Sequence, residues 1–491
     1  MMNKYLICTI FSLITAVNLH SQELLRLTIE EAIDLARRQS PSVVAAKHSF
    51  HSAYWSYRNF KANYLPSMTF SSTPRFNHWI NAITMPDGTT QFVQQNQFAV
   101  DGNLSLSQNI TLTGGRLSLN TGINRLDMLG TSNSHSYNTN PVSILYQQSL
   151  FGYNGLKWSK KTEPLRYEIA KKNYVVTLES VSLNVVNMFF GLAMAQTNLD
   201  IALTNYQNFD TLYVFAEGRY KIGRMTESEM LQWEVRRLNE ETNLQNARVY
   251  LDDNLQSFRT YLGIKDTIPI EAVTSKTIPN MNIDPYKALE LALENNPTVI
   301  SMKLNEIESE SYVASSKANY GFQANLQAQL GLSKTGENLR TAYKDPLNQQ
   351  YAQIGISVPI LDWGQGRGRI KVAESNRRLT EIQLEQERIS FEQSILRLVK
   401  QFNLQKNQVS IAEKTDYMAN KRNDVAQKLY VLGRSTILDL NAAISEKDAA
   451  KRNYISTLES FWSYYYSLRR YTLYDFEKNM LLSEDYESLL K

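Results

Sequence analysis

The chain has 491 residues, of which 43% are apolar and 20% charged, and this composition excludes both a disordered protein and a polytopic helical membrane protein. Its 52 Lys and Arg residues nearly balance its 48 Asp and Glu residues, which argues against a nucleic-acid-binding protein. Only 5 His and 1 Cys are present, so the composition disfavours a zinc or thiol-based site. Gly and Pro are also scarce, at 20 and 12, and long uninterrupted helices and strands are therefore expected.

The N-terminal segment, residues 1–22, has the pattern of a secretory signal peptide. Lys4 supplies the positive charge, and an apolar run of 13 residues from Tyr5 to Val17 follows it. Cys8 lies inside this run, before any cleavage point, so no lipid anchor is expected and the mature chain would contain no cysteine. No later stretch reaches about 18 consecutive apolar residues, so a membrane-spanning part would have to be a closed β-barrel.

The most specific feature is an internal repeat. The pattern of residues 27–41 returns at residues 283–297, and Lys61–Tyr64 recurs unchanged as Lys317–Tyr320, both at an offset of 256. Further along, residues 220–226 match residues 430–436 at an offset of 210. This difference places 46 extra residues in the first copy, before Ser149. The sequence therefore predicts a tandem duplication with one insertion.

Each repeat is expected to contain a helix, then β-strands, then a long helical hairpin. The first repeat is assigned to residues 23–275 and the second to residues 276–480, with a short C-terminal tail at 481–491. The expected elements are helix 28–63, strands 66–151 with an extra hairpin near 98–127, and helical hairpin 155–262 in the first repeat; and helix 284–319, strands 321–361 and helical hairpin 369–474 in the second.

The strand segments alternate apolar residues with neutral polar ones. From Gln97 to Lys157, 61 residues, only five residues are charged. A sheet with one apolar and one neutral polar face suits lipid on one side and a water-filled lumen on the other. A water-soluble β-sandwich is the alternative that this pattern leaves open.

The helical hairpins are predicted to be coiled-coil rods with tight turns. In the second repeat Ile395, Leu398, Phe402, Val409 and Ala412 follow a three/four spacing. At the turns, Gly223 and Gly433 are suited to the left-handed conformation that ends a helix. Thr226 with Glu229, and Thr436 with Asp439, have the spacing of a capping box that begins the next helix.

Three sets of motifs together resemble the TolC-like outer membrane efflux proteins of Gram-negative bacteria. They are the repeat openings, the strand ends Ser149–Gly152 and Pro359–Gly364, and the Tyr-x-x-Gly-Arg-x-Thr turns. The resemblance implies a mixed α/β membrane protein that forms a homotrimer, with a shared transmembrane antiparallel β-barrel in the outer membrane and a trimeric α-barrel tunnel in the periplasm. It also implies a passive exit duct of a tripartite efflux or type I secretion system, which works with a periplasmic adaptor and an inner-membrane pump. No enzymatic activity, cofactor or metal is implied.

The family's barrel takes four strands per protomer, whereas this sequence supplies six candidates, because the insertion adds a hairpin around Thr113–Gly115. In the family, an aspartate pair three residues apart narrows the tunnel. Asp439 matches its first member, but Ala442 occupies the second, so Asp439 is expected to form a single acidic ring at the periplasmic aperture, joined by Glu229. Two further sets are implied. The turns and adaptor-docking residues are Tyr220, Gly223, Arg224, Thr226, Tyr430, Gly433, Arg434 and Thr436; the strand-to-helix joints are Phe151, Gly152, Pro359 and Gly364.

The sequence also contains two enzyme-like patterns, and it leaves one other class of protein as an alternative to an efflux channel. Gly364–Arg369 follows a strand and opens a helix, as in a dinucleotide-binding fingerprint, but its third glycine comes one position early, which favours a flexible joint. His48 and His51 share a helix face without a third metal ligand nearby. The alternative function is a soluble periplasmic coiled-coil scaffold or adaptor without a membrane barrel.

Overall fold

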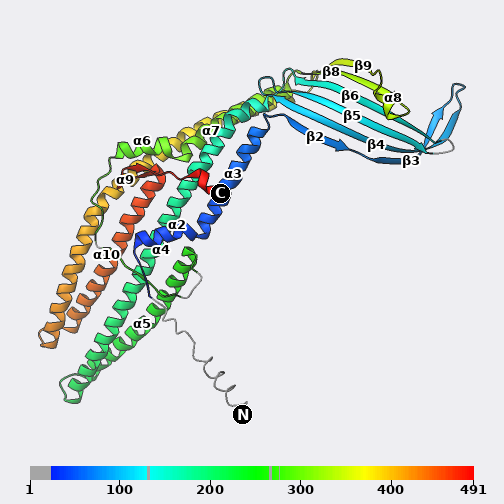
Figure 1. Cartoon of the computed structure of the whole chain (residues 1–491). Helices are drawn as coiled ribbons and strands as arrows, with labels where there is room; N and C mark the ends of the chain where they lie inside the picture. The colour runs from blue at the N-terminus through cyan, green and yellow to red at the C-terminus, as the bar shows by residue number, and fades with distance from the viewer. Residues whose placement is uncertain (1–23, 130–132, 265–267, 276, 491) are drawn as a thin grey trace, which may run out of the picture. The chain divides into compact units, whose positions relative to one another are not determined.

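The computed structural model describes residues 24–129, 133–264, 268–275 and 277–490. The segment that is predicted to be a signal peptide lies outside these residues. The chain forms two compact units. The first contains Met1–Ser49, Lys172–Asn296 and Ser390–Lys491; the second contains Phe50–Lys171 and Pro297–Ile389. Figure 1 shows their helices and strands in chain order.

The first unit is built mainly of helices. Two short strand pairs accompany them, β1 (Leu25–Leu27) with β7 (Ile270–Ala272) in parallel, and β10 (Tyr474–Asp475) with β11 (Met480–Leu481) antiparallel. The helices of this unit are α2 (Ile29–Gln39), the second part of α4 (Gly155–Lys221), α5 (Glu227–Leu262), α6 (Pro285–Asn295), the second part of α9 (Gln365–Val431), α10 (Ile437–Thr472) and the short α11 (Tyr486–Leu489).

The long helices pack through the three/four stripe that the sequence predicts. Ile395, Phe402, Val409 and Ala412 of α9 are buried, and Leu398 is half-buried. The Phe402 ring lies 5.3 Å from that of Phe461 on α10, between centroids. One long helix, α4, contains an 18-residue window that is apolar enough to cross a membrane by length and composition, and 56% of that window is buried inside the protein. We assign the window to the packed core, because Phe189 of α4 also contacts Phe258 of α5.

The second unit combines helices with one antiparallel sheet. Its helices are most of α3 (Pro41–Ala62), α7 (Pro297–Tyr320), the short α8 (Leu339–Tyr343) and the first parts of α4 and α9. Its strands are β2 (Ser67–Ser72), β3 (Arg75–Thr84), β4 (Thr90–Ile110), β5 (Gly115–Leu129), β6 (Ser134–Ser149), β8 (Gln323–Gly336) and β9 (Leu347–Ser357).

The strands follow the order β2-β4-β5-β6-β8-β9, and every neighbouring pair is antiparallel. β2 pairs with the second half of β4, and β3 pairs with its first half, so β2 and β3 share one side of β4 like a single broken strand. The sheet is thus six strands wide. The hairpin around Thr113–Gly115 is β4–β5, and it lies inside the sheet, between β2 and β6. Among the described residues, β2 and β9 do not pair with each other, and the sheet is open.

The register confirms a sheet with two chemically different faces. Residues directly opposite each other share a face, so Leu106, Leu119, Ile144, Leu330 and Ile354 fall on one side. Most large side chains of this apolar face are more than a third exposed; they include Met68, Phe70, Leu104, Leu117, Leu119, Ile144, Leu330, Ile354 and Ile356. The opposite face carries Ser107, Ser118, Asn120, Ser143, Gln327 and Gln353. No second sheet covers the apolar face within the described residues, so the β-sandwich alternative is wrong.

The structure also differs from the expected helix limits. Residues 28–63 form two helices, α2 and α3, that meet at Ser40, and residues 284–319 form α6 and α7, which meet at Asn296. Pro41 and Pro297 cause both breaks, because proline at the first position of a helix cannot donate the hydrogen bond that would continue the preceding one.

A buried ion cluster ties the first unit together. Arg469 of α10 donates to Glu179 of α4 at 2.9 Å and to Asp475 of β10 at 2.7 Å, and Arg37 of α2 pairs with Glu179 as well. The side chains of Glu179 and Asp475 are 1% and 3% exposed. Burial opposes the charge of Arg469, but the Glu179 carboxylate more than offsets it and raises the pKa of Arg469 above its ordinary value. The cluster therefore links both repeats and the strand that follows α10.

Replacing Arg469 with Ala is expected to destabilise the first unit by about 3–5 kcal/mol, since it removes the cation that pairs with the buried Asp475 and leaves the buried Glu179 with Arg37 alone. Chemical denaturation of the detergent-solubilised protein, followed by circular dichroism, measures this. Arg452→Ala on the exposed side of α10 is the control and should change stability by less than about 0.5 kcal/mol. Equal effects of the two variants would contradict the importance of the cluster.

Candidate functional site: hairpin tips, joints and exposed helix seams

The turn between α4 and α5 forms the first hairpin tip. Gly223 has φ +70°, and its N–H donates to the Tyr220 carbonyl at 2.9 Å, while the Arg224 N–H donates to the Arg219 carbonyl at 2.9 Å. An added Cβ at Gly223 would meet no atom within 4 Å, so the need for glycine here comes from the backbone conformation alone. Thr226 then caps α5: its hydroxyl accepts from the Glu229 N–H at 3.3 Å, and its own N–H donates to the Glu229 carboxylate at 2.9 Å.

The second tip, between α9 and α10, repeats this geometry. Gly433 has φ +73°, and its N–H donates to the Tyr430 carbonyl at 2.9 Å. The Thr436 hydroxyl donates to the Asp439 carboxylate at 2.6 Å and accepts from the Asp439 N–H at 3.1 Å. The structure thus brings Thr436 and Asp439 together as a capping box, as the spacing predicts.

Both tip carboxylates are exposed and remain charged to low pH. Hydrogen bonds from the side chain and backbone of Thr436 hold the pKa of Asp439 below its ordinary value, and the backbone and side chain of Thr226 lower the pKa of Glu229 in the same way. Because capping uses only part of each carboxylate, both groups still present negative charge to the solvent.

The predicted docking residues divide into packed and exposed side chains. Tyr430 is half-buried against the cluster of Phe209, Trp233 and Leu440, and its ring centroid lies 5.7 Å from that of Trp233. Burial raises the pKa of Tyr430. By contrast Tyr220, Arg224 and Arg434 are exposed. Packing is therefore the observed environment of Tyr430, and the other three side chains remain accessible.

Sequence reasoning missed four apolar side chains at the tips. Ile222 is 70% exposed, and Leu432, at the equivalent position of the second repeat, is 68% exposed. Val431 and Leu438 of the second tip are exposed too. The signal was present, since an apolar residue precedes the glycine in both turn motifs, but its exposure could not be known without the structure.

The strand-to-helix joints carry further exposed apolar and aromatic side chains. Phe151 contacts Phe322 at 5.2 Å between ring centroids, and the side chains of both are largely exposed. Gly364 has φ +83°, and its N–H and that of Gly366 donate to the Asp362 carboxylate at 2.9 and 2.8 Å, which begins α9. The exposed set at the joints is Leu150, Phe151, Tyr153, Phe322, Val358, Ile360, Leu361 and Trp363. Pro359 lies within this exposed stretch, and Gly152 follows Phe151. Aromatic and apolar belts of this kind are typical of membrane interfaces.

A second feature that sequence reasoning missed is an exposed stripe on α9, which we name the α9 seam. Leu404, Ile411, Met418 and Val425 recur every seven residues along α9 and are 52–64% exposed, and Leu432, one residue beyond its end, continues the spacing at 68% exposed. In a coiled coil, positions seven apart lie on one face, and here that face lies opposite the buried Phe402 and Val409. A row of lysines seven residues apart flanks the seam: Lys414, Lys421 and Lys428.

Helix α5 carries a matching exposed stripe, the α5 seam. Leu231, Val235, Leu238 and Val249 lie on one face of α5 and are 46–63% exposed. This seam is flanked by a row of glutamates, also seven residues apart: Glu227, Glu234 and Glu241. Two unpartnered seams in one chain, one flanked by negative and the other by positive charge, have the chemistry of complementary coiled-coil partners.

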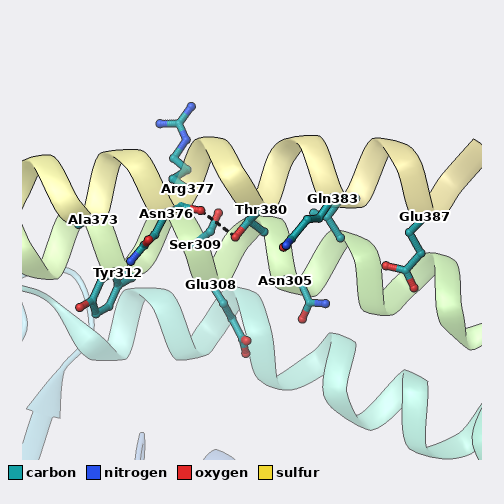
Figure 2. Close-up of a pocket in the computed structure, with 11 residues that line it drawn as sticks. Asn305, Glu308, Ser309, Tyr312, Ala373, Asn376, Arg377, Thr380, Gln383 and Glu387 are labelled. Carbon is teal, nitrogen blue, oxygen red and sulfur yellow. Dashed lines mark hydrogen bonds between the residues drawn. The ribbon is translucent and has the colours of Figure 1, made fainter.

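The groove between α7 and α9 is a weaker candidate for a functional site than the hairpin tips, the joints and the two seams. Figure 2 shows its polar lining, in a space of about 430 Å³. Two of its charged side chains already have partners: Glu308 pairs with Arg166 of α4, and Arg377, which points away from the groove, pairs with Glu381 at 2.7 Å. Among the described residues, no group of three or more His, Cys, Asp or Glu side chains could hold a metal ion.

Comparisons with known proteins confirm the resemblance of the chain to outer membrane efflux proteins. Residues 288–471 match the family described as outer membrane efflux protein. No curated protein matches the chain in sequence.

Solved structures of outer membrane proteins share the fold. The outer membrane channel CmeC of Campylobacter jejuni is 15% identical, with a TM-score of 0.67 over 94% of this chain and 88% of that one. The outer membrane protein VceC of Vibrio cholerae is 14% identical, with a TM-score of 0.63 over 90% of this chain and 95% of that one. The open state of the MtrE channel of Neisseria gonorrhoeae is 13% identical, with a TM-score of 0.60 over 90% and 88%. At such identities the likeness is one of fold.

Two substitutions separate the charge of Asp439 from its capping role. Asp439→Asn removes the charge and should weaken divalent-cation block of single-channel conductance if the carboxylate lines an aperture. Thr436→Val keeps the charge but removes the cap, at a cost of about 1 kcal/mol.

The pH dependence of the block gives a second readout for this pair. Because the pKa of Asp439 is lowered, the block should persist below the ordinary carboxylate range and disappear as pH falls through the lowered pKa. In Thr436→Val the loss should move to higher pH. An unchanged block in Asp439→Asn would assign the carboxylate to capping alone.

Proposed function

We propose that this chain is the homotrimeric exit channel of a tripartite efflux or type I secretion system, because residues 288–471 match the family described as outer membrane efflux protein. The sheet of the second unit would belong to a barrel in the outer membrane, and the long helical hairpins would form a tunnel in the periplasm. Solutes would pass passively from an inner-membrane pump to the exterior. The family and the fold are those of channel proteins, which supports a protein that performs no chemistry.

The observation that carries this proposal is the pair of exposed seams on α5 and α9. A single chain leaves both uncovered, although each has the apolar spacing of a coiled-coil interface. The seams lie on different helices and differ from each other, so the contact that would cover them is head-to-tail: the α9 seam of one copy against the α5 seam of the next. A head-to-tail contact of this kind closes into a ring when the rotation between copies allows it.

The charges that flank the seams favour one register. In the proposed ring α5 runs away from the tips and α9 runs toward them, so the two helices would be antiparallel. If Glu234 of one copy faces Lys421 of the next, the spacing of seven residues in both rows also places Glu227 opposite Lys428 and Glu241 opposite Lys414. The same register sets Leu231 against Val425 and Leu238 against Met418. Opposite charges beside an apolar seam fix partner choice and orientation in coiled coils.

The hairpin tips support a role in contact with a periplasmic adaptor. Ile222, Leu432 and Leu438 are exposed apolar side chains on otherwise polar turns, and Arg224 and Arg434 lie beside them. Exposed apolar groups next to accessible charge are typical of protein-docking surfaces. Asp439 and Glu229, whose low pKa values keep them charged, would supply acidic groups at the periplasmic aperture.

Charge reversal tests the trimer contact. The triple variant Glu227→Lys, Glu234→Lys, Glu241→Lys should dissociate the trimer, because three pairs of like charge would then face each other across the seam. The reverse set, Lys414→Glu, Lys421→Glu, Lys428→Glu, should have the same effect. Multi-angle light scattering in detergent gives the oligomeric state, with the detergent contribution subtracted.

Combining the two triple variants in one chain is the decisive arm, since it restores opposite charges in the proposed register. The combined variant should recover the trimer. Glu290→Lys on α6, away from both seams, is the control for the loss of a single carboxylate. A trimer that survives both triple variants, or a combined variant that stays dissociated, would contradict this contact.

Membrane fractionation separates the proposed channel from a soluble periplasmic scaffold. The channel should sediment with the outer membrane and require detergent for extraction, because the apolar face of its sheet is uncovered. Release of the protein into the soluble periplasmic fraction without detergent would contradict the channel proposal.

A further inference from the structure

We propose that the insertion of the first repeat enlarges the transmembrane barrel: six strands of each copy enter its wall, so that three copies close a barrel of eighteen strands. Four strands per copy, as the family resemblance implies, would give twelve. The inference rests on the proposed homotrimer but goes beyond it, because the trimer could also form with the inserted hairpin lying outside the wall.

β4 and β5 are continuous with the rest of the sheet. β5 pairs with β4 from Asn96↔Leu129 to Ile110↔Gly115, and with β6 from Arg116↔Gln147 to Met128↔Ser134. β6 in turn pairs with β8 of the second repeat. Removing the inserted hairpin from the wall would therefore break two complete ladders of backbone hydrogen bonds, and in lipid each unsatisfied group costs several kcal/mol.

The inserted strands also have the same two faces as the other strands. Leu106 of β4 and Leu119 of β5 lie on the apolar face with Leu330 of β8. Ser107 and Ser118 lie on the polar face, where their hydroxyls are 3.0 Å apart. A hairpin that rested on the outside of a barrel would not need to continue both faces in register.

On β5 the apolar face also ends at a defined level, whereas on the facing part of β4 it continues with Val100 and Phe98. Beyond Ile123, β5 places Arg125 and Asp127 on the same face, joined by an ion pair of 3.0 Å. Charges that face lipid are costly at the bilayer centre and tolerated near the interface. The apolar stretch of β5 from Leu117 to Ile123 would therefore lie in the bilayer, with the ion pair at its edge.

The sheet has two free edges, at β2 and β9, and a second copy of this chain can pair with them. Natural sheets protect exposed edges with charged residues or proline. β2 and β9 contain neither and are exposed along their whole length, and β3, on the same edge as β2, carries the single charged residue Arg75. Because each neighbouring pair is antiparallel and the path has six strands, β2 and β9 run in opposite directions. β9 of one copy beside β2 of the next then continues the antiparallel order, with the apolar face on the same side.

The wider barrel has a consequence for cargo. Diameter grows roughly linearly with strand number, so eighteen strands give a lumen about 1.5 times as wide as twelve. Barrels of about 16–18 strands leave an open aqueous channel. The polar face that would line it carries Ser, Asn and Gln side chains, so this part of the path would accept bulky solutes with little preference for charge.

Thiol labelling tests whether the inserted strands belong to the wall. In a Cys8→Ser background, each engineered cysteine is the only thiol in the chain. Leu119→Cys and Asn120→Cys probe the two faces of β5, and Leu330→Cys and Gln329→Cys are the matched pair on β8, which is not part of the insertion. In lipid vesicles a membrane-impermeant maleimide should label the Asn120 and Gln329 variants and leave the Leu119 and Leu330 variants at least tenfold less labelled. Labelling of the Leu119 variant while the Leu330 variant stays protected would overturn the inference.

Two further measurements separate the failure of this inference from that of the proposed function. Disulfide cross-linking of Thr69→Cys on β2 with a scan of β9 positions, Gln349→Cys, Tyr351→Cys and Gln353→Cys, should yield covalent trimers; pairing Ser118→Cys with the same scan should not. Electron microscopy of the detergent-solubilised trimer should give a barrel about 1.5 times as wide as twelve strands allow. Trimers with a twelve-strand diameter would overturn the wider barrel alone, whereas absence of trimers would overturn the proposed function as well.

Discussion

The feature on which the whole account depends is that α9 carries apolar residues on two opposite faces. One face, with Phe402 and Val409, is buried within the chain, and the other, with Ile411 and Met418, is exposed to solvent. A helix with two seams needs a partner on each side, and one chain supplies only one of them. The exposed seam of α5 has complementary flanking charges, so a second copy of the chain is the partner that we propose for both helices.

The sheet also needs a partner, in this case for backbone hydrogen bonds at its edges. Its edge strands β2 and β9 leave rows of backbone hydrogen-bonding groups unpaired, and its apolar face lacks a covering layer among the described residues. Lipid can cover the face, but only another strand can satisfy the edges in a bilayer. Seams on the helices and edges on the sheet thus point to one arrangement, in which copies of the chain follow one another around a common axis.

Local features could be predicted from the sequence, and distant ones could not. The capping boxes at Thr226 and Thr436 and the left-handed glycines before them depend on neighbouring residues, and the sequence was sufficient for them. The helix breaks at Pro41 and Pro297 were also visible but were overlooked. Arg469 and Glu179 are 290 positions apart, and no local pattern joins them.

The exposed seams could be predicted only in part from the sequence. Glutamates or lysines every seven residues are visible in the sequence, but a seven-residue repeat does not say whether its face is buried within the chain or left free. The sequence stripe from Ile395 to Ala412 is the buried one. The number of strands could be counted in advance, whereas the place of β4–β5 between β2 and β6 required the pairing register.

A structure of the purified protein in a lipid nanodisc, determined by electron cryomicroscopy, tests the central claim most directly. The account predicts three copies, with α9 of each against α5 of the next, Glu234 opposite Lys421, and β9 of each paired with β2 of its neighbour. Copies joined through other helix faces, or a monomer whose α5 and α9 seams remain exposed, would contradict it.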